Sequence, residues 1–152
     1  ELLKDHPDRE EISCEVIPGI TSALSCASLL GAPIVEDFCT ISLSDYMTPW
    51  ERIINRLEHA CAGDFVIALY NPRSQARPDY LEKALSVVRK FREGSTPVGL
   101  VRNAYREDQK VVVLPLENFD PEMVDMFCTV IIGNSKTYQA NGLMITSRGY
   151  QL

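Results

Sequence analysis

The stretch D-F-V-I-A-L-Y-N-P-R-S-Q-A-R-P, residues 64–78, decides the fold class and raises the question of function. Its five consecutive apolar residues, 65–69, are typical of a strand that is buried on both faces of a sheet. Polar residues follow the strand directly: Tyr70, Asn71, Arg73, Ser74 and Arg77. An aromatic ring, an amide and two guanidinium groups at the end of a buried strand indicate a ligand site there.

The apolar pattern on both sides of this strand predicts an alternation of strands and helices. We expect strands at 14–19, 38–44, 64–71, 97–104, 110–116 and 129–135, with a last edge strand at 143–149. We expect helices at 21–31, 48–63 and 79–91, and a short one after Asp120. The strands at 97–104 and 110–116 should form a hairpin.

Capping boxes predict where two of the helices begin. Thr48 with Glu51 marks one start, and Asp79 with Glu82 marks the other. The helix after Asp79 should bury a face at helical spacing: Leu81, Ala84, Leu85, Val88 and Phe91.

The alternation of elements predicts an α/β fold in which helices cover both faces of a sheet, a three-layer αβα domain. Because the strands read as continuous apolar runs, we expect a mixed, largely parallel sheet. Ligands of such sheets bind outside the carboxyl ends of the strands. The strand-end segments 18–22, 70–74, 102–104 and 133–135 should therefore meet at one rim and form a polar site.

Each candidate residue has a second interpretation. Thr21 or Ser22 is either part of a ligand site or only a helix N-cap. Asn71 either binds a polar ligand or simply ends a strand. Arg73 and Arg77, like Arg102, either pair with ligand carboxylates or lie in solvent.

Composition excludes several classes of function. The 152 residues carry a net charge of -6, which disfavours binding to nucleic acid or to acidic membranes. No apolar run approaches the ~18 residues that a membrane span needs. The five cysteines are scattered, and most lie in apolar runs, which is typical of buried free thiols in a reducing cytoplasm. The polar first residues, without an initiator Met, read as an interior segment of a longer protein.

No motif assigns a catalytic residue or a metal site. The sequence has no G-x-S-x-G elbow, no P-loop, no dinucleotide-binding loop, no paired-carboxylate signature and no metal-ligating cluster. We therefore expect the ligand to supply the chemistry and the protein to orient it.

The strand-end motifs, in this order, resemble the tetrapyrrole methylase family, the class III S-adenosylmethionine-dependent methyltransferases of corrin and sirohaem synthesis. The motifs are V-I-P-G-I-T-S-A-L-S-C-A-S-L-L-G-A-P-I, Y-N-P-R-S-Q-A-R, P-V-G-L-V-R-N-A-Y-R, T-V-I-I-G-N-S-K-T and M-I-T-S-R-G-Y, and they cover most of residues 12–150. Two positions depart from the family pattern: Tyr105 replaces a frequent glycine, and Ser147 a frequent proline.

The resemblance implies a domain organisation and a reaction. Residues 1–13 would be an interdomain linker and 14–152 the C-terminal domain of the class III methyltransferase fold. The N-terminal domain, with its G-P-G and G-D-P-G loops, would lie outside this chain. The motifs are most similar to the branch that methylates C17 of precorrin-3B, or of its cobalt form, with ring contraction during cobalamin synthesis. Another corrin or sirohaem methylase is one alternative, and a non-catalytic ligand-binding or dimerisation module is another.

The resemblance also implies partners and site residues. S-adenosylmethionine would lie between two domains, and family members are homodimers. The cofactor half-site in this chain would be Thr21, Ser22, Tyr70, Asn71 and Ala104. Charge, rather than the resemblance, leads us to expect that carboxylates of the tetrapyrrole bind three arginines: Arg73, Arg77 and Arg102.

Overall fold

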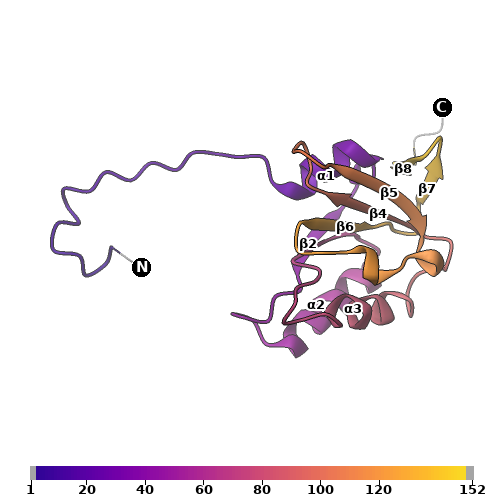
Figure 1. Ribbon diagram of the computed structural model, residues 1–152, viewed down its shortest axis with the longest axis horizontal. Helices are drawn as coiled ribbons and strands as arrows, with labels where there is room; N and C mark the ends of the chain where they lie inside the picture. The colour runs from indigo at the N-terminus through magenta and orange to yellow at the C-terminus, as the bar shows by residue number, and fades with distance from the viewer. Residues whose placement is uncertain (1–2, 150–152) are drawn as a thin grey trace.

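The computed structural model describes residues 3–149, and its centre is a five-stranded sheet covered on both faces. The strand order is β2 (Phe38–Ser42), β3 (Val66–Tyr70), β6 (Cys128–Ile132), β4 (Pro97–Arg102) and β5 (Lys110–Pro115). Figure 1 shows α2 (Trp50–Ala62) and α3 (Tyr80–Val88) on one face and α1 (Ser22–Leu30) on the other. The predicted three-layer α/β fold is confirmed.

The directions of the strands correct one part of the prediction. β2 pairs with β3 in parallel, whereas the pairs β3–β6, β4–β6 and β4–β5 are all antiparallel. The sheet is mixed, as predicted, but it is not largely parallel. The apolar runs predict burial on both faces correctly, yet such burial accommodates either direction when helices cover both faces.

The direction of β6 moves one predicted segment away from the ligand rim. β2, β3 and β4 point the same way and β6 points the opposite way, so residues 133–135 lie at the far end of the sheet. There the Asn134 side chain donates to the backbone oxygen of Asp64, just before β3 begins (3.1 Å). The prediction that all four strand-end segments converge is therefore wrong for this one.

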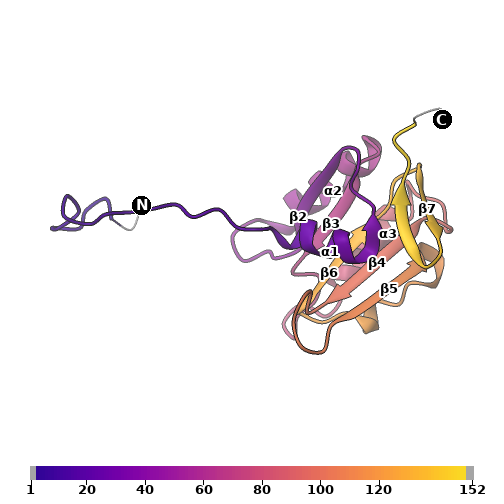
Figure 2. The ribbon, with the colours of Figure 1, turned by 90° about the horizontal axis from the view of Figure 1, so that it is seen from above.

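Each face of the sheet has its own apolar core. On the α2–α3 face, buried residues of both helices pack against the sheet, among them Leu57 and Leu85. On the other face α1 buries Ala23, Cys26, Ala27 and Leu30. Figure 2 shows α1 lying over this face of the sheet.

The helix starts differ from the predicted capping boxes. α2 begins after Pro49, and neither α2 nor α3 has a side-chain cap. Asp79 instead forms an ion pair with Lys83 one turn later (2.6 Å). Phe91 lies beyond the end of α3 and is exposed, whereas the other predicted face residues are buried.

A second, smaller sheet was not predicted. Its order is β1 (Gly31–Ala32), β8 (Leu143–Thr146) and β7 (Thr137–Ala140). β8 is therefore the central strand of this sheet and not an edge strand of the main one. The predicted hairpin of β4 and β5 is present, and after Asp120 a short 3₁₀ helix, Pro121–Met123, follows another at Leu116–Asn118.

The segment before α1 has no regular structure. Residues 14–19 were predicted to form a strand, but the structure has none there, and Val16 and Ile17 are 94% and 78% exposed. Figures 1 and 2 show the segment before α1 running away from the sheet, and no strand within residues 3–149 pairs with it. Apolar content alone does not make a strand that has no partner. Residues 1–2 of the predicted linker and 150–152 of the predicted domain lie outside the described residues.

Within residues 3–149, every helix is too short or too polar to cross a membrane.

Candidate functional site

A cavity of about 470 Å³ opens where β3 and β4 end and α1 begins. Its volume lies in the range of small-molecule sites. The residues that line it are Ile20, Ser22, Ser25, Cys26, Tyr70, Asn71, Val101, Asn103, Ala104, Arg106, Met126, Phe127, Cys128 and Thr129.

Four of the five residues predicted to bind the cofactor line this one cavity: Ser22, Tyr70, Asn71 and Ala104. The fifth, Thr21, shares a hydrogen bond with the Tyr70 hydroxyl (2.6 Å). Three of the four predicted strand-end segments thus meet at the rim of the cavity.

The Tyr70 hydroxyl explains how α1 begins. Thr21 is the N-cap residue by position, but its side chain does not cap the helix. The Tyr70 hydroxyl accepts the Ala23 N–H instead (2.9 Å), so β3 fixes the start of α1. The Ser22 amide has no acceptor among residues 3–149, which leaves an N–H beside the cavity for a ligand oxygen.

The ends of β3 and β4 have an uncommon backbone conformation. Asn71 and Asn103 have φ values of 50° and 51°, and Tyr105 has 58°. Asparagine tolerates this left-handed region better than most residues, and a bulky residue tolerates it poorly. Such conformations gather at ligand sites, where the surrounding structure holds them.

The arginines after β3 are paired within the protein. Arg73 donates to Glu122 (2.7 Å) and to the backbone oxygen of Pro121 (3.0 Å). Arg77 donates to Ser44 (2.7 Å) and lies 3.4 Å from an Asp45 oxygen. The Tyr80 hydroxyl also donates to Asp45 (2.6 Å), and this bond is the main reason that the pKa of Asp45 is below its ordinary value. Neither arginine lines the cavity.

Arg102 is paired in the same way. Its guanidinium donates to Asp125 (2.8 Å) and lies over the Phe127 ring. Burial pushes the pKa of Asp125 up, but hydrogen bonds from Arg102, from the Cys128 thiol and from the Phe127 N–H outweigh it, so the pKa lies below its ordinary value. Arg102 thus supports the loop that carries Phe127 into the cavity wall, and it does not line the cavity itself.

Sequence reasoning missed one wall of the cavity, which is formed by residues just before and at the start of β6: Met126, Phe127, Cys128 and Thr129. Because β6 is antiparallel to β3 and β4, its amino end lies beside their carboxyl ends. No motif marks these residues, and only the direction of β6 would have revealed them.

The cysteines of the cavity wall are neutral thiols. Burial raises the pKa of Cys26, and it raises the pKa of Cys128 to about 11. A protonated thiol is a poor nucleophile. The two cysteines of the cavity wall are therefore not activated nucleophiles. Within residues 3–149, no group of His, Cys, Asp and Glu side chains has the arrangement of a metal site.

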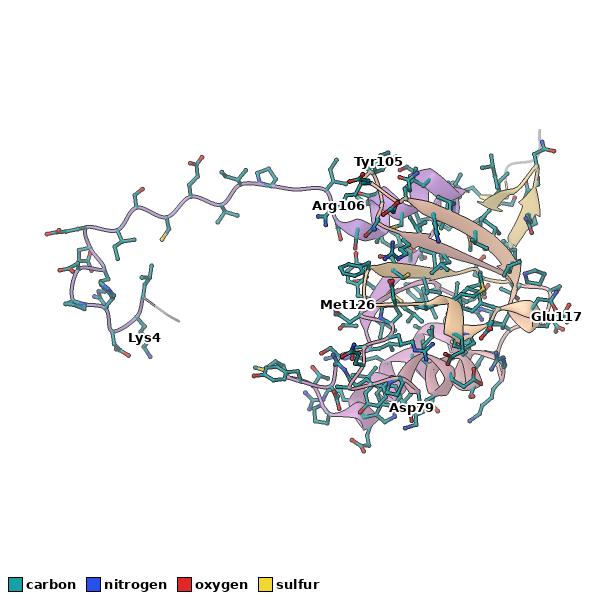
Figure 3. All side chains as sticks on the ribbon, viewed as in Figure 1. Lys4, Asp79, Tyr105, Arg106, Glu117 and Met126 are labelled. Carbon is teal, nitrogen blue, oxygen red and sulfur yellow. The ribbon has the colours of Figure 1, made fainter. Side chains whose placement is uncertain are left out.

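The turn between β4 and β5 forms the last wall, and sequence reasoning did not assign Arg106 to the site. In Figure 3, Tyr105 and Arg106 lie at the same end of the molecule as Met126. The Tyr105 hydroxyl shares a hydrogen bond with Ser28 of α1 (2.8 Å), and the Tyr105 N–H donates to the Gln109 side chain (2.7 Å). This turn is therefore anchored to both α1 and its own hairpin.

Comparison with known proteins gives consistent matches. Residues 2–120 match the family model of the tetrapyrrole (corrin/porphyrin) methylases. The chain is 50% identical over 140 residues to the cobalt-factor III methyltransferase of Priestia megaterium, covering 92% of this chain and 26% of that protein. It is 44% identical over 128 residues to the precorrin-3B C(17)-methyltransferase of Sinorhizobium sp, covering 84% of this chain and 50% of the relative.

A solved structure has the same fold. The crystal structure of the methyltransferase CobJ superposes with a TM-score of 0.88 at 36% identity, covering 95% of this chain and 61% of that one. The chain thus spans between about a quarter and three fifths of the length of these proteins. It belongs to the tetrapyrrole (corrin/porphyrin) methylase family.

Proposed function

We propose that the protein to which this chain belongs transfers a methyl group from S-adenosylmethionine to C17 of precorrin-3B, or of its cobalt form, with ring contraction, in cobalamin biosynthesis. The observation that carries the proposal is the identity of 50% and 44% to relatives named for these reactions, over most of the chain. The site geometry supports it, because residues from three of the matching motifs, Ser22, Tyr70 and Ala104 among them, line one cavity.

We propose that Thr21, Ser22, Tyr70, Asn71 and Ala104 form half of the S-adenosylmethionine site. Their arrangement around one cavity of ligand size supports this assignment. The donor supplies an electrophilic methyl group on a sulfonium, so the reaction needs alignment more than activation. The strand-end backbone and the first turn of α1 would hold the donor in place and keep water from the reacting atoms.

The proposal that Arg73, Arg77 and Arg102 bind tetrapyrrole carboxylates needs an exchange of partners. Each guanidinium pairs with a carboxylate of the protein: Glu122, Asp45 and Asp125, respectively. A substrate carboxylate would have to share or replace these partners, which costs part of the energy that it gains.

The remaining parts of the proposal concern the whole protein. Residues 1–13 would link this C-terminal domain, 14–152, to a further domain that completes the cleft, and the partial coverage of the relatives supports this. The family resemblance supports a homodimer. The five cysteines form no disulfide, which supports a reducing, cytoplasmic location. Sedimentation of the purified protein would test the homodimer.

The function is tested with the complete protein, S-adenosylmethionine and each of the two macrocycles in turn. The expected product carries one additional methyl group by mass spectrometry and has the altered absorption spectrum of a contracted ring. Methylation of an earlier or later corrin intermediate, or of a sirohaem precursor, would favour another methylase of the family. Binding of S-adenosylhomocysteine without turnover of any tetrapyrrole would favour a ligand-binding module.

A further inference from the structure

We infer that Arg106 recognises a carboxylate of the ligand that occupies the cavity, an inference that rests on the proposed function. Three observations carry it: the charge of the cavity wall, the pairing of the neighbouring arginines and the anchoring of the turn on which Arg106 lies.

Among residues 3–149, Arg106 alone gives the cavity wall a formal charge. The other lining residues are serines, asparagines, a threonine, a tyrosine, neutral thiols and apolar side chains. The protein as a whole has a net charge of -6, so a positive group in this wall runs against the general charge of the molecule. A cavity whose single ionised side chain is a guanidinium favours an anionic group on its ligand.

The guanidinium of Arg106 is available for a ligand. Within residues 3–149 it makes no ion pair, and its side chain takes part in no hydrogen bond. Arg73, Arg77 and Arg102 have their partners inside the protein. Binding to Arg106 therefore displaces only water, whereas binding to any of the other three must compete with an existing ion pair.

The turn that carries Arg106 is held in place before any ligand arrives. The Asn103 N–H donates to the Phe127 oxygen (3.2 Å), and the Arg106 N–H donates to the Asn103 oxygen (2.9 Å). Tyr105, between them, is tied to Ser28 and Gln109. A backbone that is already ordered loses less entropy when its side chain binds, so this anchoring favours a recognition role.

Two ligand carboxylates could meet Arg106. One is the methionine carboxylate of S-adenosylmethionine, and the other is a peripheral carboxylate of the tetrapyrrole. Both have the chemistry that a guanidinium recognises, and ligands that lack one or the other distinguish them.

The test compares three variants of the complete protein: Arg106→Gln, Arg106→Lys and Arg52→Gln. Arg52 is an exposed arginine of α2 outside the cavity, so its variant controls for the loss of one surface charge. Calorimetry measures the binding of S-adenosylhomocysteine and of its decarboxylated analogue, and steady-state kinetics gives the KM for the tetrapyrrole. We expect Arg106→Gln to weaken one of these ligands roughly 10- to 100-fold, Arg106→Lys to weaken it less, and Arg52→Gln to have no effect.

The pattern of losses identifies the source of the carboxylate. Weaker binding of S-adenosylhomocysteine, with unchanged binding of the decarboxylated analogue, assigns Arg106 to the methyl donor. A higher KM for the tetrapyrrole, with unchanged binding of S-adenosylhomocysteine, assigns it to the macrocycle. If Arg106→Gln equals the wild type in both measurements while the wild type is active, the inference is wrong and the proposed function stands. A wild type that binds neither ligand would overturn both.

Discussion

At the scale of single residues, Tyr105 combines a local cost with a structural gain. Its φ of 58° is a conformation that costs a non-glycine residue roughly 1–2 kcal/mol, and the family pattern frequently has glycine at this position. The side chain offsets part of this cost, because its hydroxyl bonds to Ser28 and so ties the β4–β5 turn to α1. Two walls of the cavity are thereby connected.

We predict that Tyr105→Phe lowers the free energy of unfolding by about 0.5 kcal/mol, because it removes one hydrogen bond that is largely open to solvent. Ser28→Ala removes this bond and also the bond from Ser28 Oγ to the Ser25 oxygen (2.8 Å), and the double variant should cost less than the sum of the two single losses. Denaturant titrations measure all three values. Tyr138→Phe, at an exposed tyrosine whose hydroxyl makes no hydrogen bond within residues 3–149, is the control. Strictly additive losses would show that the two hydroxyls do not interact.

At the scale of elements, the sequence predicts burial well and direction poorly. The continuous apolar runs of β3, β4 and β6 are buried as predicted, but the same runs would suit either strand direction. Tyr70 and Ala104, at the ends of β3 and β4, line the cavity as strand-end residues were expected to, whereas Phe127 was missed because the direction of β6 was not predicted. The capping boxes were also misleading, since Asp79 has a competing partner in Lys83 that the motif does not report.

The packing of α1 on the sheet depends on a glycine in β4. A Cβ at Gly99 would lie 2.5 Å from a methyl carbon of Leu30, the buried residue at the end of α1. The absence of a side chain at this position therefore sets how closely the helix approaches the sheet. Since the first turn of α1 forms part of the cavity, this contact also helps to place Ser22.

We expect Gly99→Ala to lower the free energy of unfolding by about 1–3 kcal/mol, as overpacking in a buried core does. Chemical denaturation measures the loss. Gly19→Ala is the matched control, because a Cβ at Gly19 meets no atom within 4 Å and should change the stability little. A Gly99→Ala protein as stable as the wild type would show that Leu30 repacks freely and that α1 is not held at a fixed distance.

At the scale of the whole molecule, ion pairs and hydrogen bonds to carboxylates connect distant parts of the chain near the end of the sheet that carries the cavity. Arg77 and Tyr80 reach Asp45 from more than thirty residues away, and Arg102 at the end of β4 reaches Asp125 before β6. None of these pairs is readable from the sequence, where the arginines appeared available for a ligand. The fold brings each one to a carboxylate that is remote along the chain.

These pairs predict how the stability of the folded protein responds to acid. The pKa values of Asp45 and Asp125 are lower in the folded protein than the ordinary value of about 3.9 for an unfolded chain. A carboxyl group whose pKa is lower in the folded protein stabilises the fold at pH values above its pKa in the unfolded chain. This stabilisation is lost as the pH falls through its pKa in the folded protein. The free energy of unfolding should therefore decrease as the pH is lowered from about 5 to below 3.

The Arg102→Gln variant isolates one of the two carboxylates. Without its guanidinium partner Asp125 keeps the opposing effect of burial, so its pKa should rise and the variant should lose less stability than the wild type over this acid range. Arg52→Gln removes the same formal charge from α2, where Arg52 forms no ion pair within residues 3–149, and should keep the wild-type slope. Urea titrations at a series of pH values measure the slopes. If Arg102→Gln and Arg52→Gln lose stability equally on acidification, the Arg102–Asp125 pair does not lower the carboxyl pKa, and its role is limited to positioning the loop that carries Phe127.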